Sequence, residues 1–155
     1  MKRLRPFRPP KVRDPVTMRI IRSIAAVLAG LGFMAATATV GMLVSSLALH
    51  RDNPEVRLTP TAFSVFLYLN LVFYGIGGIL GGWLAARIGS TAPYGHAAAM
   101  AAIVAVLAIN AATAMPTPGQ PGWYPSALGL VAVTGVLLGG KLRAAAASAP
   151  IADRV

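Results

Sequence analysis

The chain has 155 residues, of which 56% are hydrophobic and only 12% are charged, about half the charged fraction of a typical soluble domain. Its 14 Lys and Arg against 4 Asp and Glu give a formal net charge of +10, and there is no cysteine. The composition excludes a soluble globular domain. The missing cysteine excludes disulfides, thiol catalysis and cysteine metal sites.

Long uncharged blocks predict four membrane-spanning helices. Residues 23–50, 58–86 and 88–140 contain no Asp, Glu, Lys or Arg. Because about 20 apolar residues cross the hydrocarbon core, the first two blocks supply one helix each. The third supplies two, since Met115–Pro125 turns the chain with four prolines. The expected fold is all-α and integral to the membrane, with a basic arm at 1–14, helices at about 15–49, 60–87, 93–115 and 125–143, and a tail at 144–155.

Local residues mark the starts of these helices. Asp14-Pro15 and Thr59-Pro60 each place an N-cap residue before a proline at the first helical position. Pro93 and Pro125 open the other two helices. The first apolar run is longer than the roughly 7–15 residues of a signal-peptide core, so we expect this helix to remain uncleaved.

The distribution of basic residues predicts the orientation in the membrane. Arg87, Lys141 and Arg143 fall on the same side as the N-terminal arm, and few basic residues fall on the other side. The excess of Lys and Arg on cytoplasmic loops predicts that both termini lie in the cytoplasm. Eight basic residues precede the apolar part of the first helix, and we expect them to contact anionic lipid headgroups or, alternatively, a protein partner: Lys2, Arg3, Arg5, Arg8, Lys11, Arg13, Arg19 and Arg22. Nucleic acid is not an expected partner.

Aromatic residues near the helix ends are typical of the membrane interface. Trp123 and Tyr124 are expected at the outer interface, and Trp83 at the inner one.

The stretch "YGIGGILGGWLAAR" concentrates glycine inside an apolar block. It lacks the G-x-G-x-x-G order of a dinucleotide loop, because Leu80 stands where the third glycine would be. Gly77/Gly81 and Gly78/Gly82 instead form two G-x-x-x-G pairs, which favour close helix contact in lipid. The predicted helix-packing residues are Gly75, Gly77, Gly78, Gly81, Gly82, Gly135, Gly139 and Gly140. Similar small-residue stripes are Ala25, Ala29, Gly32, Ala36 and Thr39 in the first helix, Ala97, Ala101, Ala105, Ala108 and Ala112 in the third, and Ala132, Gly135 and Gly139 in the fourth. These patterns leave open whether the contacts form within one chain or between chains.

A short internal repeat links the second and fourth helices. "GGILGGWLAA" at 77–86 matches "GVLLGGKLRA" at 135–144 at Gly, Leu-Gly-Gly, Leu and Ala. The match favours two helical hairpins in the same orientation, a parallel repeat in which the two glycine clusters pack near each other.

Few residues in the predicted spans carry chemistry. Asn70 and Asn110 are the strongest candidates for buried polar groups, which most often form hydrogen bonds between helices. No acid, Lys or Arg lies within the hydrocarbon zone, which argues against a pump or a proton-coupled carrier. His50 and His96 fall at opposite surfaces, and no nucleophile–base pair or metal-ligand spacing is present. We therefore predict a non-enzyme without cofactor, catalytic site or metal site.

Several motifs resemble a widespread group of small bacterial four-helix membrane proteins that have no established function. The matching residues span about Phe63–Arg143 and are Gly81-Gly82-Trp83-Leu84-Ala85-Ala86-Arg87, His96, Trp123-Tyr124-Pro125 and Gly139-Gly140-Lys141-Leu142. The resemblance implies the same topology and assigns no site. The long basic arm is not part of that pattern.

The expected function is structural or interactive: an accessory subunit of a membrane complex, or a homo-oligomer. The alternative is a small transporter or channel for a neutral solute, with Asn70, Asn110 and tyrosines along its path.

Overall fold

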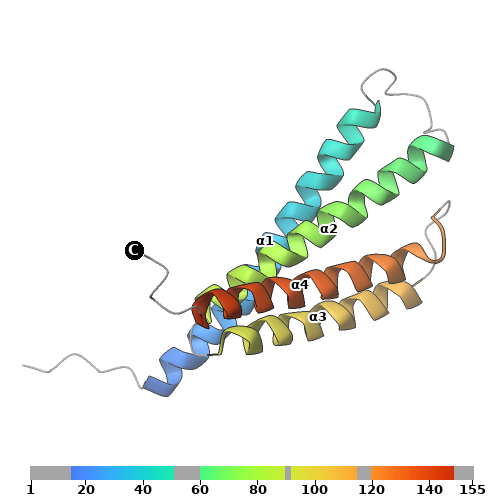
Figure 1. Cartoon of the computed structure of the whole chain (residues 1–155). Helices are drawn as coiled ribbons and strands as arrows, with labels where there is room; N and C mark the ends of the chain where they lie inside the picture. The colour runs from blue at the N-terminus through green and yellow to red at the C-terminus, as the bar shows by residue number, and fades with distance from the viewer. Residues whose placement is uncertain (1–14, 51–59, 90–91, 115–119, 149–155) are drawn as a thin grey trace, which may run out of the picture.

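The apolar blocks form four helices, α1 (Pro15–His50), α2 (Pro60–Ile88), α3 (Pro93–Thr113) and α4 (Tyr124–Ser148) (Figure 1). The computed structural model describes residues 15–50, 60–89, 92–114 and 120–148, and 94% of these are helical. All four helices are long and apolar enough to cross a membrane. The prediction of an all-α, four-helix membrane protein is confirmed.

The helix ends differ from the predicted ends mainly in α3 and α4. The last turn of α3 stops at Thr113, whose hydroxyl donates to the Ile109 and Asn110 carbonyls, at 3.0 and 3.1 Å. Helix α4 continues past its expected end at Arg143 to Ser148, because the four alanines between these residues are the strongest helix formers. The arm at 1–14 and the capping residue Thr59 lie outside the described residues.

The helices form two hairpins that run in the same direction (Figure 1). At the centre, α2 and α4 share the most extensive helix contact, with α1 packed on α2 and α3 packed on α4. Within the described helices, α1 does not contact α4. The hairpins meet at the end where α1 begins and α2 ends, which we name the convergent end, and they separate toward the opposite, splayed end (Figure 1).

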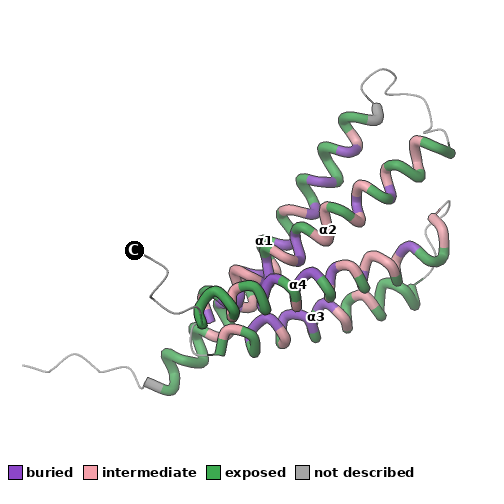
Figure 2. Tube along the Cα trace, in the orientation of Figure 1, coloured by how far each residue is buried: buried purple, intermediate pink, exposed green. Residues whose placement is uncertain are grey.

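Small side chains build the core, which lies toward the convergent end (Figure 2). The largest fully buried residues are Met100, Val136 and Ser45. Only 22–33% of the most apolar stretch of each helix is buried inside the chain. Most apolar side chains therefore face outward, as a bilayer requires.

Candidate functional site

The glycines of α2 and α4 bring the two helix backbones into direct contact. A Cβ added at Gly78 would lie 2.8 Å from the Ala132 carbonyl oxygen, and one added at Gly135 would lie 2.8 Å from the Gly75 carbonyl oxygen. The Cβ added at Gly78 would also lie 3.3 Å from the Gly135 Cα, and the Cβ added at Gly135 would lie 3.3 Å from the Gly78 Cα. No side chain larger than a hydrogen atom fits between the helices at this level.

This contact is reciprocal along α2 and α4. One turn further on, Gly82 faces the Val136 carbonyl, and Gly139 faces the Ile79 carbonyl. Equivalent positions differ by 57 in residue number (78 and 135, 82 and 139, 79 and 136). In the sequence match between 77–86 and 135–144, matched residues differ by 58 in number. The residues that occupy equivalent places in the contact are therefore shifted by one position from those that match in sequence. The two glycine clusters nevertheless lie against each other, within one chain.

A second face of α2 packs on α1. A Cβ added at Gly81 would lie 2.6 Å from the Gly30 carbonyl oxygen, and one at Gly30 would lie 2.8 Å from the Gly81 carbonyl oxygen. Gly77 faces Met34 and Thr37 of α1. The two G-x-x-x-G pairs thus serve different neighbours: Gly77/Gly81 contacts α1, and Gly78/Gly82 contacts α4.

The remaining predicted packing glycines have peripheral roles. Gly75 approaches a methyl group of Val131 on α4, at 3.1 Å from its added Cβ. Gly140 faces away from α2 and packs on Ala97 of α3.

Met100 of α3 contacts both Gly30 of α1 and Gly81 of α2, so one side chain packs against two neighbouring helices at once.

The small-residue stripe predicted for α1 lies on the wrong side of that helix. Ala25, Ala36 and Thr39 are exposed, and nothing lies within 4 Å of a Cβ added at Gly32. The packed face carries a second set of residues, Ala26, Gly30, Met34, Ala38, Gly41 and Ser45. Both sides of α1 hold small residues, so residue size alone does not reveal which side is buried.

The two predicted buried asparagines have different environments. Asn70 is buried, and its side chain lies near the Tyr124 hydroxyl. Asn110 is exposed, and its amide donates to the Val106 carbonyl at 2.8 Å, one turn back on its own helix. The prediction that Asn110 is buried is wrong, because α3 leaves the core before this turn.

The neighbouring aromatic residues Trp123 and Tyr124 also differ in burial. Trp123 is half exposed and stacks on Tyr68, with ring centroids 6.3 Å apart. Tyr124, the first residue of α4, is 94% buried within the chain, and its position at the outer interface stays a prediction. At the convergent end, the Arg87 guanidinium lies 5.1 Å from the centre of the Trp83 ring, a cation–π contact.

His96 and Ser23 join α3 to α1 at the convergent end. His96 is 91% buried, its Nδ1 lies 2.7 Å from the Ala92 carbonyl oxygen, and its Nε2 lies 3.0 Å from the Ser23 hydroxyl. A carbonyl only accepts, so Nδ1 carries a proton and donates. The Ser23 hydroxyl donates to Nε2 in the tautomer in which Nδ1 carries the only ring proton. Sequence analysis missed this pair; the one local signal was a histidine in the first turn of a helix that is otherwise uncharged.

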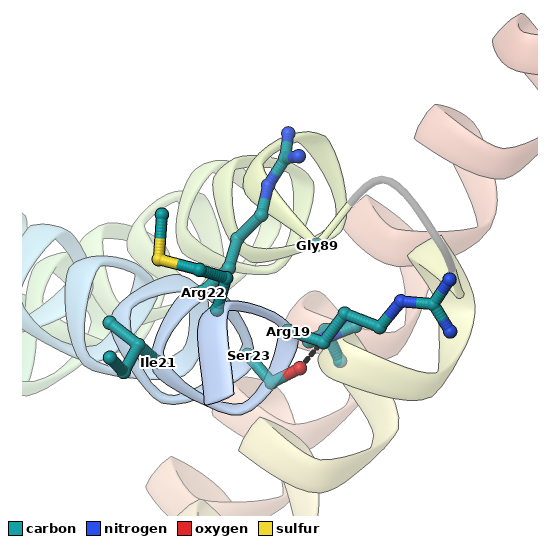
Figure 3. Close-up of a pocket in the computed structure, with 7 residues that line it drawn as sticks. Arg19, Ile21, Arg22, Ser23 and Gly89 are labelled. Atoms are coloured by element: carbon teal, nitrogen blue, oxygen red, sulfur yellow. Dashed lines mark hydrogen bonds between the residues drawn. The ribbon is translucent and has the colours of Figure 1, made fainter. Parts of the chain in front are cut away.

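Two arginines of α1 flank the same junction (Figure 3). The Arg22 Nε donates to the Ile88 carbonyl at 2.9 Å, which caps the negative end of the α2 dipole. The Arg19 side chain leaves α1 in a different direction (Figure 3). Both arginines, with Ser23, Gly89 and His96, line a hollow of about 380 Å³.

Replacing Ser23 by alanine should weaken the α1–α3 junction. It leaves His96 Nε2 without its hydroxyl donor, and we expect a loss of about 0.5–1.5 kcal/mol in unfolding free energy. Thermal unfolding of the purified protein in detergent measures the loss. Ser126→Ala, at an exposed position of α4, is the matched control and should be neutral. Equal stability of both variants would contradict a functional hydrogen bond at His96.

Other predicted contact residues lie outside the described part of the chain. These are Lys2, Arg3, Arg5, Arg8, Lys11 and Arg13 of the basic arm. Among the described residues, no three His, Cys, Asp or Glu side chains gather as metal ligands would. No family model matches the chain, and comparisons with curated proteins and with solved structures find no match.

Proposed function

We propose that this multi-pass membrane protein acts without catalysis, as an accessory subunit of a membrane complex or as a homo-oligomer, and that α1 supplies its contact surface. It resides in a bacterial inner membrane with both termini in the cytoplasm, and its basic arm contacts anionic lipid or a cytoplasmic partner. The resemblance to small bacterial four-helix membrane proteins agrees with this proposal but names no partner.

The observation that carries the proposal is the open side of α1. Helix α1 has 36 residues, packs mainly on α2 and makes no described contact with α4. The side opposite its packed face holds Ala25, Gly32 and Ala36, all exposed. In lipid, helices associate where small residues allow their backbones to approach. A surface that could admit another helix therefore remains unused within this chain.

The basic residues support the proposed orientation. Arg19, Arg22, Arg87, Lys141 and Arg143 all lie toward the convergent end, and the described residues include no Asp or Glu. An excess of Lys and Arg is typical of the cytoplasmic side.

Replacing Gly32 by leucine tests the proposal. The Cβ meets open space, so the chain should fold normally, whereas a leucine on this side would block an approaching helix. We expect wild-type protein purified in mild detergent to carry a partner or a second copy, as seen by mass spectrometry, and Gly32→Leu to lose most of it. Ala48→Leu, an exposed change at the other end of the same helix, should retain it.

Other outcomes favour other functions. A wild-type protein that purifies as a lone monomer would contradict both forms of the proposal. Asn70→Ala should leave assembly intact. If it instead abolishes uptake of a neutral solute into proteoliposomes, the transporter alternative is correct, with Asn70 and Tyr124 on the solute path.

A further inference from the structure

A groove runs between α1 and α3 from the His96–Ser23 pair toward the membrane interior. It has a volume of about 540 Å³, within the range of small-molecule sites. Ser23, Val27 and Leu28 form part of the α1 wall, and Gly95, Ala99 and Ile103 form part of the α3 wall. The groove exists because α1 and α3 touch only near the convergent end.

The two ends of the groove differ in chemistry. At the convergent end, Ser23 and His96 belong both to this groove and to the hollow that Arg19 and Arg22 line. About two turns further along α1, only aliphatic side chains such as Leu28 and Ile103 remain. A ligand that matches both parts carries a negative charge at one end and a hydrocarbon chain at the other.

Among the described residues, the positive charge of Arg19 and Arg22 at the polar end has no acidic counterpart. Arg22 uses its Nε on the Ile88 carbonyl, which fixes the side chain and leaves its terminal nitrogens as further donors. The described residues include no carboxylate that could neutralise either arginine. Arg87 beside the Trp83 ring marks this level as the membrane interface, where lipid phosphates lie.

We propose that this groove binds one anionic phospholipid. Its phosphate sits in the hollow that Arg19 and Arg22 line, beside the Ser23–His96 pair, and one acyl chain lies along Leu28, Ala99 and Ile103. This site goes beyond the diffuse attraction of a basic arm, because it fixes one lipid at one place between two helices. It is independent of the α1 contact surface on the opposite side.

Native mass spectrometry of the full chain in mild detergent tests the site, with phosphatidylglycerol or phosphatidylethanolamine added. We expect one phosphatidylglycerol retained per chain, and clearly weaker retention of phosphatidylethanolamine. The double variant Arg19→Gln/Arg22→Gln should bind phosphatidylglycerol about tenfold more weakly or worse. Arg87→Gln/Arg143→Gln removes the same charge at the same end, outside the groove, and should bind within about twofold of the wild type.

A second pair of variants tests the acyl part. Ala99→Phe fills the groove at an exposed position and should abolish retention, whereas Ala112→Phe, exposed on α3 outside the groove, should not. Helicity and thermal unfolding confirm that each variant is folded.

Four results would overturn the site: equal retention of both lipids, equal weakening by both arginine pairs, no effect of Ala99→Phe, or displacement of the lipid by inorganic phosphate, which would indicate a free-anion site. A change in oligomeric state on Ala99→Phe with unchanged lipid binding would assign the groove to a second copy instead. The two proposals fail separately. If lipid binding is absent while partner capture persists, only the lipid site is wrong; if partner capture is absent while lipid binding persists, only the proposed function is wrong.

Discussion

Gly82→Ala is expected to destabilise the protein by about 2 kcal/mol, and Gly82→Leu to prevent folding. The added Cβ would meet the Val136 carbonyl group, whose carbon atom would be 2.8 Å away. Backbone atoms of a packed helix move only if the whole helix shifts, and overpacking of this kind costs about 1–3 kcal/mol or more. The gain of up to about 1 kcal/mol in helix propensity offsets part of that cost. Thermal unfolding in detergent, followed by circular dichroism, measures the change.

The chain supplies its own control for this prediction. Gly32 is also helical, but nothing lies within 4 Å of its added Cβ, so Gly32→Ala should be neutral or slightly stabilising. Gly139→Ala should behave like Gly82→Ala, because it meets the Ile79 carbonyl in the reciprocal contact. If all three variants unfold alike, the α2–α4 backbone contact does not limit stability.

Met100→Ala is expected to cost about 2–4 kcal/mol. Met100 is fully buried, and its side chain fills the junction of α1, α2 and α3 beside Gly30 and Gly81. Neither glycine can fill the space that alanine leaves, so a cavity remains, and cavities in packed cores account for losses of this size. Equilibrium unfolding of the reconstituted protein by denaturant or heat measures the loss.

Leu107→Ala is the control on the same helix. Its side chain is 60% exposed toward lipid, so we expect less than about 0.5 kcal/mol. A Met100→Ala variant as stable as Leu107→Ala would mean that α3 is held by its contact with α4 alone.

The fold could be predicted because length and hydropathy decide it locally. The first two uncharged blocks form one helix each and the third forms two, and prolines at 15, 60 and 93 open three of the four helices. The glycine pairs also predicted close packing, because G-x-x-x-G spacing is visible within one helix. The neighbour of each pair could not be predicted, since adjacent residues such as Gly77 and Gly78 face different helices.

The site depended on distant partners and was harder to predict. Ser23 and His96 are 73 positions apart, and nothing in either local sequence indicates the other. Asn70 and Asn110 look alike in sequence, yet Asn70 is buried and Asn110 is exposed. The stripe on α1 was misplaced because both sides of that helix carry small residues, and the choice between them rests on where α2 presents Gly77 and Gly81.

The reciprocal α2–α4 contact has a consequence for biogenesis. Gly78 against Gly135, with Gly82 and Gly139 each facing the other helix's backbone, is the pattern of a symmetric dimer interface contained in one polypeptide. Until α4 is inserted, the first hairpin carries an unsatisfied, self-complementary glycine surface. Two copies of the first hairpin would meet through the same pattern that α2 and α4 form within one chain.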